Sequence, residues 1–139
     1  MILIVCVDKN NGMLFNKRRQ SSDKVLIEHI IDMSKDKNLW IKHFSKNVFD
    51  QYELKNLIID DELLEHAKNE DYCFIEDILL SSDIIGKFDK IIVYNWNRKY
   101  PSDVYFDIDL TDWILESETD FKGNSHDKIT QKIYKRGLN

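Results

Sequence analysis

Apolar residues occur along this chain in short runs that alternate with amphipathic segments. Four runs are nearly continuous, as in strands buried on both faces of a sheet. They are residues 2–7, 39–42, 57–59 and 72–75. Between them, apolar residues recur at helical spacing after residues that can cap a helix, namely Ser22 or Asp23, Ser45, and Asp60. This alternation predicts a mostly parallel sheet with helices on both of its faces.

The pattern changes after a predicted helix over residues 78–85. Three strand-like runs follow without another helical segment: residues 91–96, 104–108 and 113–118. The last run, residues 128–134, alternates apolar and polar side chains, which favours an antiparallel edge strand; Ser125 as a cap leaves a helix as the alternative. We therefore expect a single three-layer α/β domain over residues 1–139 that ends in an antiparallel strand pair.

Composition and charge narrow the classes of partner. The chain has 139 residues, 42% of them hydrophobic, which fits one domain with a sizeable core. A net charge of −5 provides no general basic field, so a nucleic-acid partner is not favoured and would need a local basic patch. The first apolar run has no positive leader and stops at Asp8, which predicts a cytoplasmic protein without a membrane span. Cys6 and Cys73 lie in apolar runs and are expected to be buried thiols.

The C-terminal third carries a family pattern. A Lys-apolar-Asp turn, a strand, the start of a second strand and an Asp-Trp pair follow one another. They are Lys87-Phe88-Asp89, residues 91–96, residues 102–107 and Asp112-Trp113. This order resembles the terminal strand pair of dihydrofolate reductases. The opening, residues 5–12, is similar to theirs as well, and Asp23 matches the acidic residue that hydrogen-bonds the pterin ring in that family. The resemblance implies a dihydrofolate-reductase-like fold with Asp23 as an acid or base in the cleft.

The positions that hold the cofactor in that family differ here. Residues 44–49 replace its phosphate-binding segment and leave Lys46 alone as a phosphate contact. Glu76-Asp77 replaces the glycine pair that lets a pyrophosphate approach bare backbone. Two carboxylates at that point would repel phosphate and block its approach. Arg18 also stands where the family has a Trp. We therefore predict no cofactor and no NADPH-dependent reduction.

Two basic segments provide the candidate ligand-binding residues. Arg18 and Arg19 lie in a loop that would overhang the cleft, where guanidinium groups can hold a phosphate or a carboxylate. Arg98, flanked by Trp96 and Tyr100, belongs to a mixture of cation and aromatic rings that can stack a nucleotide base. The alternatives are a solvated loop and an ordinary strand end, respectively.

No metal centre is predicted. Asp107 and Asp109 would point to the same side of a regular strand and could hold Mg²⁺, but such a pair is more often a charged edge that resists aggregation. The four histidines have no metal-ligand spacing. The opening and ending also look like those of a short bacterial family labelled ribonuclease Z, but the His-x-His-x-Asp-His metal motif of that enzyme is absent from this sequence.

Ser125-His126-Asp127 has the composition of a catalytic triad but not its geometry. Neighbouring residues of an extended chain point in opposite directions, whereas the side chains of a triad converge from separate places. His126 is instead expected to lie in a polar turn, as a single pH-responsive hydrogen-bonding group near the cleft.

Three hypotheses for function follow. The first is a non-catalytic or repurposed binding domain that has lost its dinucleotide site. The second is a divergent enzyme acting on a small anionic or nucleotide ligand in the same cleft. The third is a protein-interaction module whose partner surface would include Trp40, Trp96 and Tyr100. Edge strands over residues 104–108 or 128–134 would also allow a homodimer.

Overall fold

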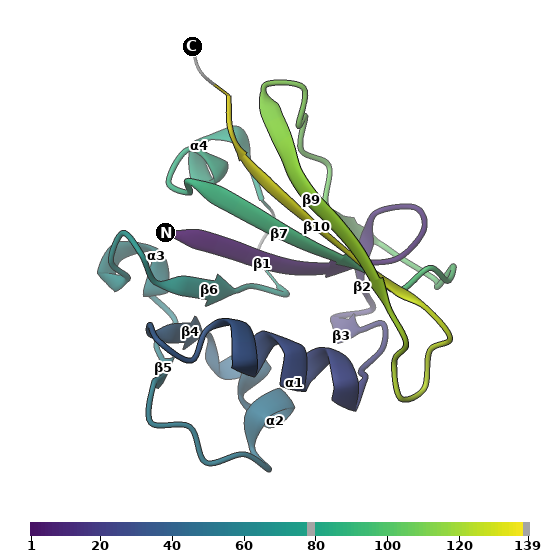
Figure 1. Cartoon of the computed structure of the whole chain (residues 1–139), viewed down its shortest axis with the longest axis horizontal. Helices are drawn as coiled ribbons and strands as arrows, with labels where there is room; N and C mark the ends of the chain where they lie inside the picture. Colours follow the sequence, from purple (N-terminus) through teal and green to yellow (C-terminus); the bar gives the residue numbers. More distant parts are fainter. Residues whose placement is uncertain (78–79, 138–139) are drawn as a thin grey trace.

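The computed structural model describes residues 1–77 and 80–137. Its centre is a seven-stranded sheet, and Figure 1 shows how the helices lie against it. The strand order across the sheet is β5-β4-β6-β1-β7-β10-β9. The bounds are Ile2–Val7 for β1, Leu39–Ile41 for β4, Leu57–Ile59 for β5, Tyr72–Phe74 for β6, Lys90–Asn95 for β7, Trp113–Phe121 for β9 and Ile129–Arg136 for β10.

The sheet is mostly parallel, as the apolar pattern predicts. Neighbours from β5 to β7 all pair in parallel, whereas β10 runs antiparallel to both β7 and β9. Strand β1 lies between β6 and β7, in the middle of the sheet, which explains why Leu3, Ile4 and Val5 are all fully buried. The predicted α/β architecture with a C-terminal antiparallel strand pair is confirmed.

Helices cover both faces of the sheet. Helices α1 (Lys24–Met33) and α2 (Lys46–Phe49), the latter preceded by the short 3-10 helix η1 (His43–Ser45), belong to the core cluster on one face. Helices α3 (Leu63–His66) and α4 (Ser82–Ile85) belong to the cluster on the other. The first residues of the helix predicted over 78–85, residues 78–79, lie outside the described residues. No helix of the described part is long and apolar enough to cross a membrane.

Helix α1 forms where a cap and an apolar stripe coincide. The Asp23 carboxylate accepts hydrogen bonds from the backbone N–H groups of Val25 and Leu26, which would otherwise be unpaired at the helix start. Leu26, Ile27 and Ile30 recur at helical spacing and are buried against the sheet. Each such side chain contributes about 1.5–3 kcal/mol by leaving water.

The basic segment predicted as a loop is a β-hairpin. Strands β2 (Gly12–Phe15) and β3 (Arg18–Arg19) pair antiparallel, and β8 (Val104–Tyr105) joins β2 to complete a second, three-stranded sheet. The turn between β2 and β3 consists of Asn16 and Lys17, with φ of 51° and 62°. These left-handed values match the twist of a two-residue hairpin turn. The hairpin lies between β1 and α1, and it turns the side chain of Arg19 toward the cavity.

The prediction that residues 128–134 form an edge strand is wrong. Strand β10 lies inside the sheet between β7 and β9, and the nine-residue β9 forms the edge. The alternation along β10 means that one face of the strand is more buried than the other. It does not tell whether the strand pairs with one neighbouring strand or with two. A homodimer through residues 128–134 therefore has no free edge to use.

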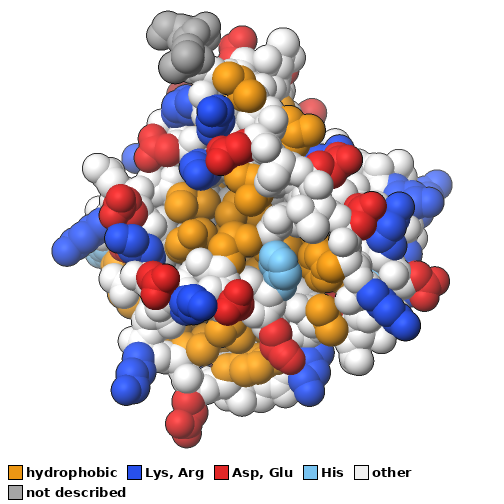
Figure 2. Space-filling view, viewed as in Figure 1, with side chains coloured by type: hydrophobic (Ala, Val, Ile, Leu, Met, Phe, Trp, Pro, Cys, Tyr) orange, Lys and Arg blue, Asp and Glu red, His pale blue; other side chains and the backbone are white. Residues whose placement is uncertain are grey.

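Charges of both signs cover the surface seen in Figure 2, where apolar side chains gather in the middle of the face, between α1 and β9. This face presents no field of a single sign. The distribution agrees with the net charge of −5, which argued against a general basic surface.

Candidate functional site

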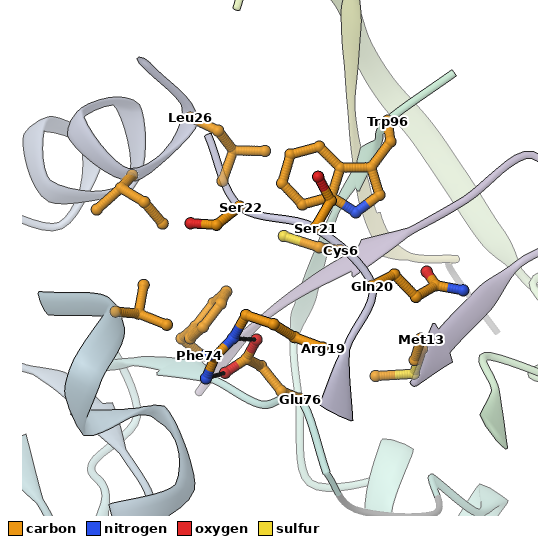
Figure 3. Close-up of a pocket in the computed structure, with 12 residues that line it drawn as sticks. Cys6, Met13, Arg19, Gln20, Ser21, Ser22, Leu26, Phe74, Glu76 and Trp96 are labelled. Atoms are coloured by element: carbon orange, nitrogen blue, oxygen red, sulfur yellow. Dashed lines mark hydrogen bonds and ion pairs between the residues drawn. The ribbon is translucent and has the colours of Figure 1, made fainter. Parts of the chain in front are cut away.

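The candidate site is a cleft at the carboxyl ends of the central strands. Cys6 comes from β1, Phe74 from β6, and Trp96 follows β7, while Arg19 and Ser21 approach from the hairpin side (Figure 3). Ligands of open α/β sheets bind at this end of the strands. The cavity is narrow, about 20 Å³, which is room for roughly one water molecule.

An ion pair closes the cleft. Arg19 donates from Nε to Glu76 Oε2 at 2.8 Å and from its terminal NH2 to Glu76 Oε1 at 2.9 Å. The same NH2 group also donates to the Phe44 carbonyl at 3.2 Å, and Ser45 Oγ donates to Glu76 Oε1 at 2.6 Å. Figure 3 shows the two parallel hydrogen bonds of the pair. Such a two-pronged contact is the strongest and most directional form of this ion pair.

The negative charges of Glu76 and Asp77, the two acids expected to repel a phosphate, are each paired with a positive charge. Glu76 is paired with Arg19, and Asp77 Oδ2 lies 3.2 Å from Lys42 Nζ. The repulsion that the sequence predicted for an incoming phosphate is therefore largely cancelled. Obstruction remains, because the side chains of Arg19 and Glu76 fill the end of β6. Arg19, predicted as an anion clamp, already holds a carboxylate of its own chain.

The Asp23 carboxylate is buried, and both of its oxygens accept hydrogen bonds from the protein. Its carboxylate accepts from the backbone of Asn124 at 2.9 Å and of Ser125 at 2.8 Å, in addition to its capping bonds to α1. Burial opposes ionisation, but hydrogen bonds from the backbone of Asn124, from His126 and from the backbone of Ser125 hold the pKa of Asp23 well below its usual range. Asp23 thus stays ionised and ties the β9–β10 turn to the start of α1.

His126 contacts side chains from two other segments of the chain, one just before α1 and one after β7. Its Nδ1 lies 2.9 Å from Asp23 Oδ2, and its Nε2 lies 3.1 Å from Ser21 Oγ and 3.0 Å from the Tyr100 hydroxyl. Its ring stacks on Trp96 with a centroid distance of 4.6 Å. Both the His126 and Asp23 side chains are almost completely buried, at 1% and 0% exposure. His126 was predicted to be a hydrogen-bonding group in a polar turn near the cleft, and its hydrogen bonds agree with this prediction.

Asp8 fixes the loop that carries Tyr100. Its Oδ1 accepts from the backbone of Asn10 and Gly12 at 2.8 Å each, and its Oδ2 accepts from the backbone of Tyr100 at 3.0 Å. Asp8 is completely buried, and burial opposes its ionisation; the bonds from Tyr100, Gly12 and Asn10 nevertheless lower its pKa. This carboxylate therefore sets the position of Tyr100 against His126.

Of the other predicted binding residues, Trp96 lines the cavity, whereas Arg18, Lys46 and Arg98 do not. Arg18 is exposed on β3, and Lys46 pairs with Asp50 on the surface of α2. Arg98 donates to the Ser125 carbonyl at 3.0 Å. Trp96 is 4% exposed and faces His126, so Trp96 and Arg98 do not form an open platform for a base.

Side chains that could share a metal ion meet on α3 rather than at the cleft. Among the described residues, Glu62, Glu65 and His66 form such a group, and all three are exposed. Asp109 of the predicted pair instead accepts from the backbone of Thr111 at 2.9 Å. Exposed acids of this kind are ordinary surface groups.

Comparison with known proteins supports the fold. The sequence matches no protein-family model and no curated protein. The structure is similar to dihydrofolate reductase from Enterococcus faecalis, solved in complex with NADP(H) and RAB-propyl. The TM-score is 0.72 over 99% of this chain and 96% of that chain, at 9% sequence identity. The chain therefore has a dihydrofolate-reductase-like fold; an identity this low carries no information about activity.

Proposed function

We propose that this protein is a repurposed dihydrofolate-reductase-like binding domain that takes a small anionic ligand and does not use NADPH. The observation that carries the proposal is the Arg19–Glu76 pair across the cleft. Arg19 thereby lines the cavity as a cation, and its pair with Glu76 lies just after β6, where the family resemblance would put a pyrophosphate.

The size of the cavity supports a small ligand. Pockets for cofactors and drug-sized molecules measure about 300–1,000 Å³, whereas this cavity is about 20 Å³. A ligand has to displace side chains, and the Arg19–Glu76 contact is the natural point of opening. A carboxylate or phosphate on the ligand would replace Glu76 as the partner of the guanidinium group, so the displaced hydrogen bonds would be remade.

Titration calorimetry with inorganic phosphate and with succinate tests this proposal. The wild type is expected to bind one of these anions, and Arg19→Ala is expected to lose that binding. Arg98→Ala is the matched control, because Arg98 is a surface arginine bonded to a backbone carbonyl outside the cleft. Equal binding by wild type and Arg19→Ala would overturn the proposal.

A divergent enzyme in the same cleft is the second candidate. The observation in its favour is the buried His126 held between Asp23 on one nitrogen and two hydroxyl groups on the other. The third candidate, a protein-interaction module, has less support. Trp40 and Trp96 are buried, at 8% and 4% exposure, and Tyr100 is half-buried, so these residues do not form the exposed surface that the hypothesis needs.

We also propose a cytoplasmic location. Cys6 and Cys73 are both free thiols, as is usual for proteins kept in a reducing compartment. Recovery of the protein in a secreted or membrane fraction of its cells would contradict this location.

A further inference from the structure

We propose that Ser21, His126 and Asp23 form a nucleophile–base–carboxylate triad that hydrolyses small esters at the cleft. The inference develops the second candidate above and rests on the proposal that the cleft admits a small ligand. It does not depend on NADPH or on a metal ion.

The three side chains have the mutual geometry of a triad. Ser21 Oγ lies 3.1 Å from His126 Nε2, and His126 Nδ1 lies 2.9 Å from Asp23 Oδ2. Both distances are within the reach that links a nucleophile to its base and the base to an orienting carboxylate. The side chains converge from the start of α1 and from the β9–β10 turn, 103 residues apart for Asp23 and His126. This is the convergence that Ser125-His126-Asp127 lacks.

The charges are arranged for base catalysis. Asp23 remains ionised because backbone N–H groups of Asn124 and Ser125 donate to it. It therefore favours the tautomer of His126 with the proton on Nδ1 and stabilises the imidazolium that forms when Nε2 takes a proton. The Trp96 ring packs against the imidazole and fixes its orientation. His126 is thus held with Nε2 toward Ser21.

Ser21 also lines the cavity, so a ligand that enters can reach it (Figure 3). Within residues 1–77 and 80–137, the backbone N–H groups of Ser21 and Ser22 make no hydrogen bond to the protein. The N–H of the residue that follows a nucleophilic serine is a common donor to the oxyanion. We assign this role to the N–H of Ser22, which follows Ser21 and lines the same cavity.

Tyr100 competes with Ser21 for the same nitrogen. Its hydroxyl lies 3.0 Å from His126 Nε2 and 3.4 Å from Ser21 Oγ. A neutral imidazole offers one lone pair at Nε2, so the serine is activated when the tyrosine hydroxyl bonds elsewhere. Removing that hydroxyl should leave Nε2 to Ser21.

The reaction balances without any further reactant than water. Ser21 Oγ forms a bond to the acyl carbon while its proton moves to His126 Nε2. The bond from the acyl carbon to the leaving oxygen breaks, and that oxygen takes the proton from Nε2 to leave as an alcohol. Water then attacks the acyl-serine, gives a proton to Nε2, and a carboxylic acid departs as Ser21 Oγ regains its proton.

Diisopropyl fluorophosphate, a small reagent for activated serines, tests the assignment with peptide mass spectrometry. The wild type is expected to carry the label on Ser21. Ser21→Ala should lose it, whereas Ser82→Ala, at an exposed serine of α4 away from the cleft, should keep it. His126→Gln should slow the labelling and the release of p-nitrophenol from p-nitrophenyl acetate by about 100-fold or more.

Three results would overturn the proposal: no label on the folded wild type, a label on Tyr100 in place of Ser21, or labelling of Ser21 at an unchanged rate in folded His126→Gln. The position of the label on the wild type decides the claim even where His126→Gln does not fold. Arg19→Ala separates the two proposals, because it should lose phosphate or succinate binding while Ser21 remains open to the reagent.

Discussion

The guanidinium group of Arg19 and the carboxylate of Glu76 meet edge to edge across the cleft, with both hydrogen bonds shorter than 3 Å. The Arg19 side chain is 22% exposed and the Glu76 side chain 10% exposed, so most of the pair is shielded from solvent. This contact joins the hairpin that carries Arg19 to the segment after β6 that carries Glu76. We propose that the cleft opens when a ligand takes the place of Glu76 on Arg19.

Removing one partner of this pair should destabilise the fold more than removing both. Arg19→Met leaves Glu76 buried without its cation, and we expect the free energy of unfolding to fall by about 2 kcal/mol, less than for a fully buried pair because Arg19 is partly exposed. The double variant Arg19→Met/Glu76→Leu should recover most of this loss. Urea denaturation of both variants checks the prediction, and equal losses would contradict it.

The reactivity of Cys6 should report the opening of the cleft. Burial, together with the negative charge of Glu76, raises the pKa of Cys6, and burial raises the pKa of Cys73 to about 12. Both thiols should therefore react slowly with iodoacetamide at pH 8. Glu76→Ala should accelerate the modification of Cys6 alone, because it opens the cavity that Cys6 lines and removes a negative charge that raises the pKa of Cys6, whereas Cys73 does not line the cavity. Peptide mass spectrometry separates the two sites; parallel acceleration of both would indicate general unfolding instead.

Two glycines provide a matched test of the turn that carries His126. A Cβ atom at Gly123 would lie 2.6 Å from Asp23 Oδ2 and 2.9 Å from Ile129 Cδ1, and neither group is free to move. Gly123→Ala should therefore cost about 1–3 kcal/mol. At Gly86, the nearest atom to such a Cβ is 3.4 Å away, so Gly86→Ala should be neutral or slightly stabilising. Thermal denaturation compares the two, and equal effects would argue against the close approach of Gly123 to Asp23.

Asp23 should contribute a pH-dependent part of the stability. Its pKa is lower in the folded state than the usual value near 3.9 of the unfolded chain. The contribution is therefore fully present above about pH 4 and is lost as the pH falls through the folded pKa. Asp23→Asn should lose about 2 kcal/mol at pH 7, because an amide NH2 cannot accept the hydrogen bonds from Ser125 and His126.

The loss in Asp23→Asn should shrink as the pH falls below 4. Free energies of unfolding measured by urea denaturation between pH 2 and 7 give this dependence. Asp127→Asn is the control, because Asp127 is exposed in the same turn. A difference between Asp23→Asn and wild type that is constant across this range would contradict the assigned role.

The sequence was informative where one local signal decides one element. The continuous apolar run at residues 2–7 indicated a strand buried inside the sheet, and Ser22 or Asp23 before an apolar stripe indicated the start of α1. Both elements are confirmed, and the cap is Asp23. The position of β10 could not be obtained in this way, because alternation reports burial and the neighbours of a strand depend on the whole chain.

The candidate site depended on contacts that no local pattern contains. Arg19 was selected for its charge, but its partner Glu76 is 57 residues away. The hairpin that creates this contact has Asn16 and Lys17 in its turn. This pair predicts a hairpin less strongly than a turn that contains glycine. His126 was assigned to a polar turn near the cleft, yet its contacts with Ser21 and Asp23 follow from how the β9–β10 turn folds back over α1.

Thermal denaturation with NADPH and with small anions is the most direct test of the central claim, that the cleft is repurposed for a small anionic ligand. A ligand at a hundredfold excess over its Kd stabilises the folded state by about 2.7 kcal/mol. We predict no change in melting temperature with NADPH, and an increase with phosphate or succinate that disappears in Arg19→Ala. An increase with NADPH that survives in Arg19→Ala would contradict the account and restore a dinucleotide site to this fold.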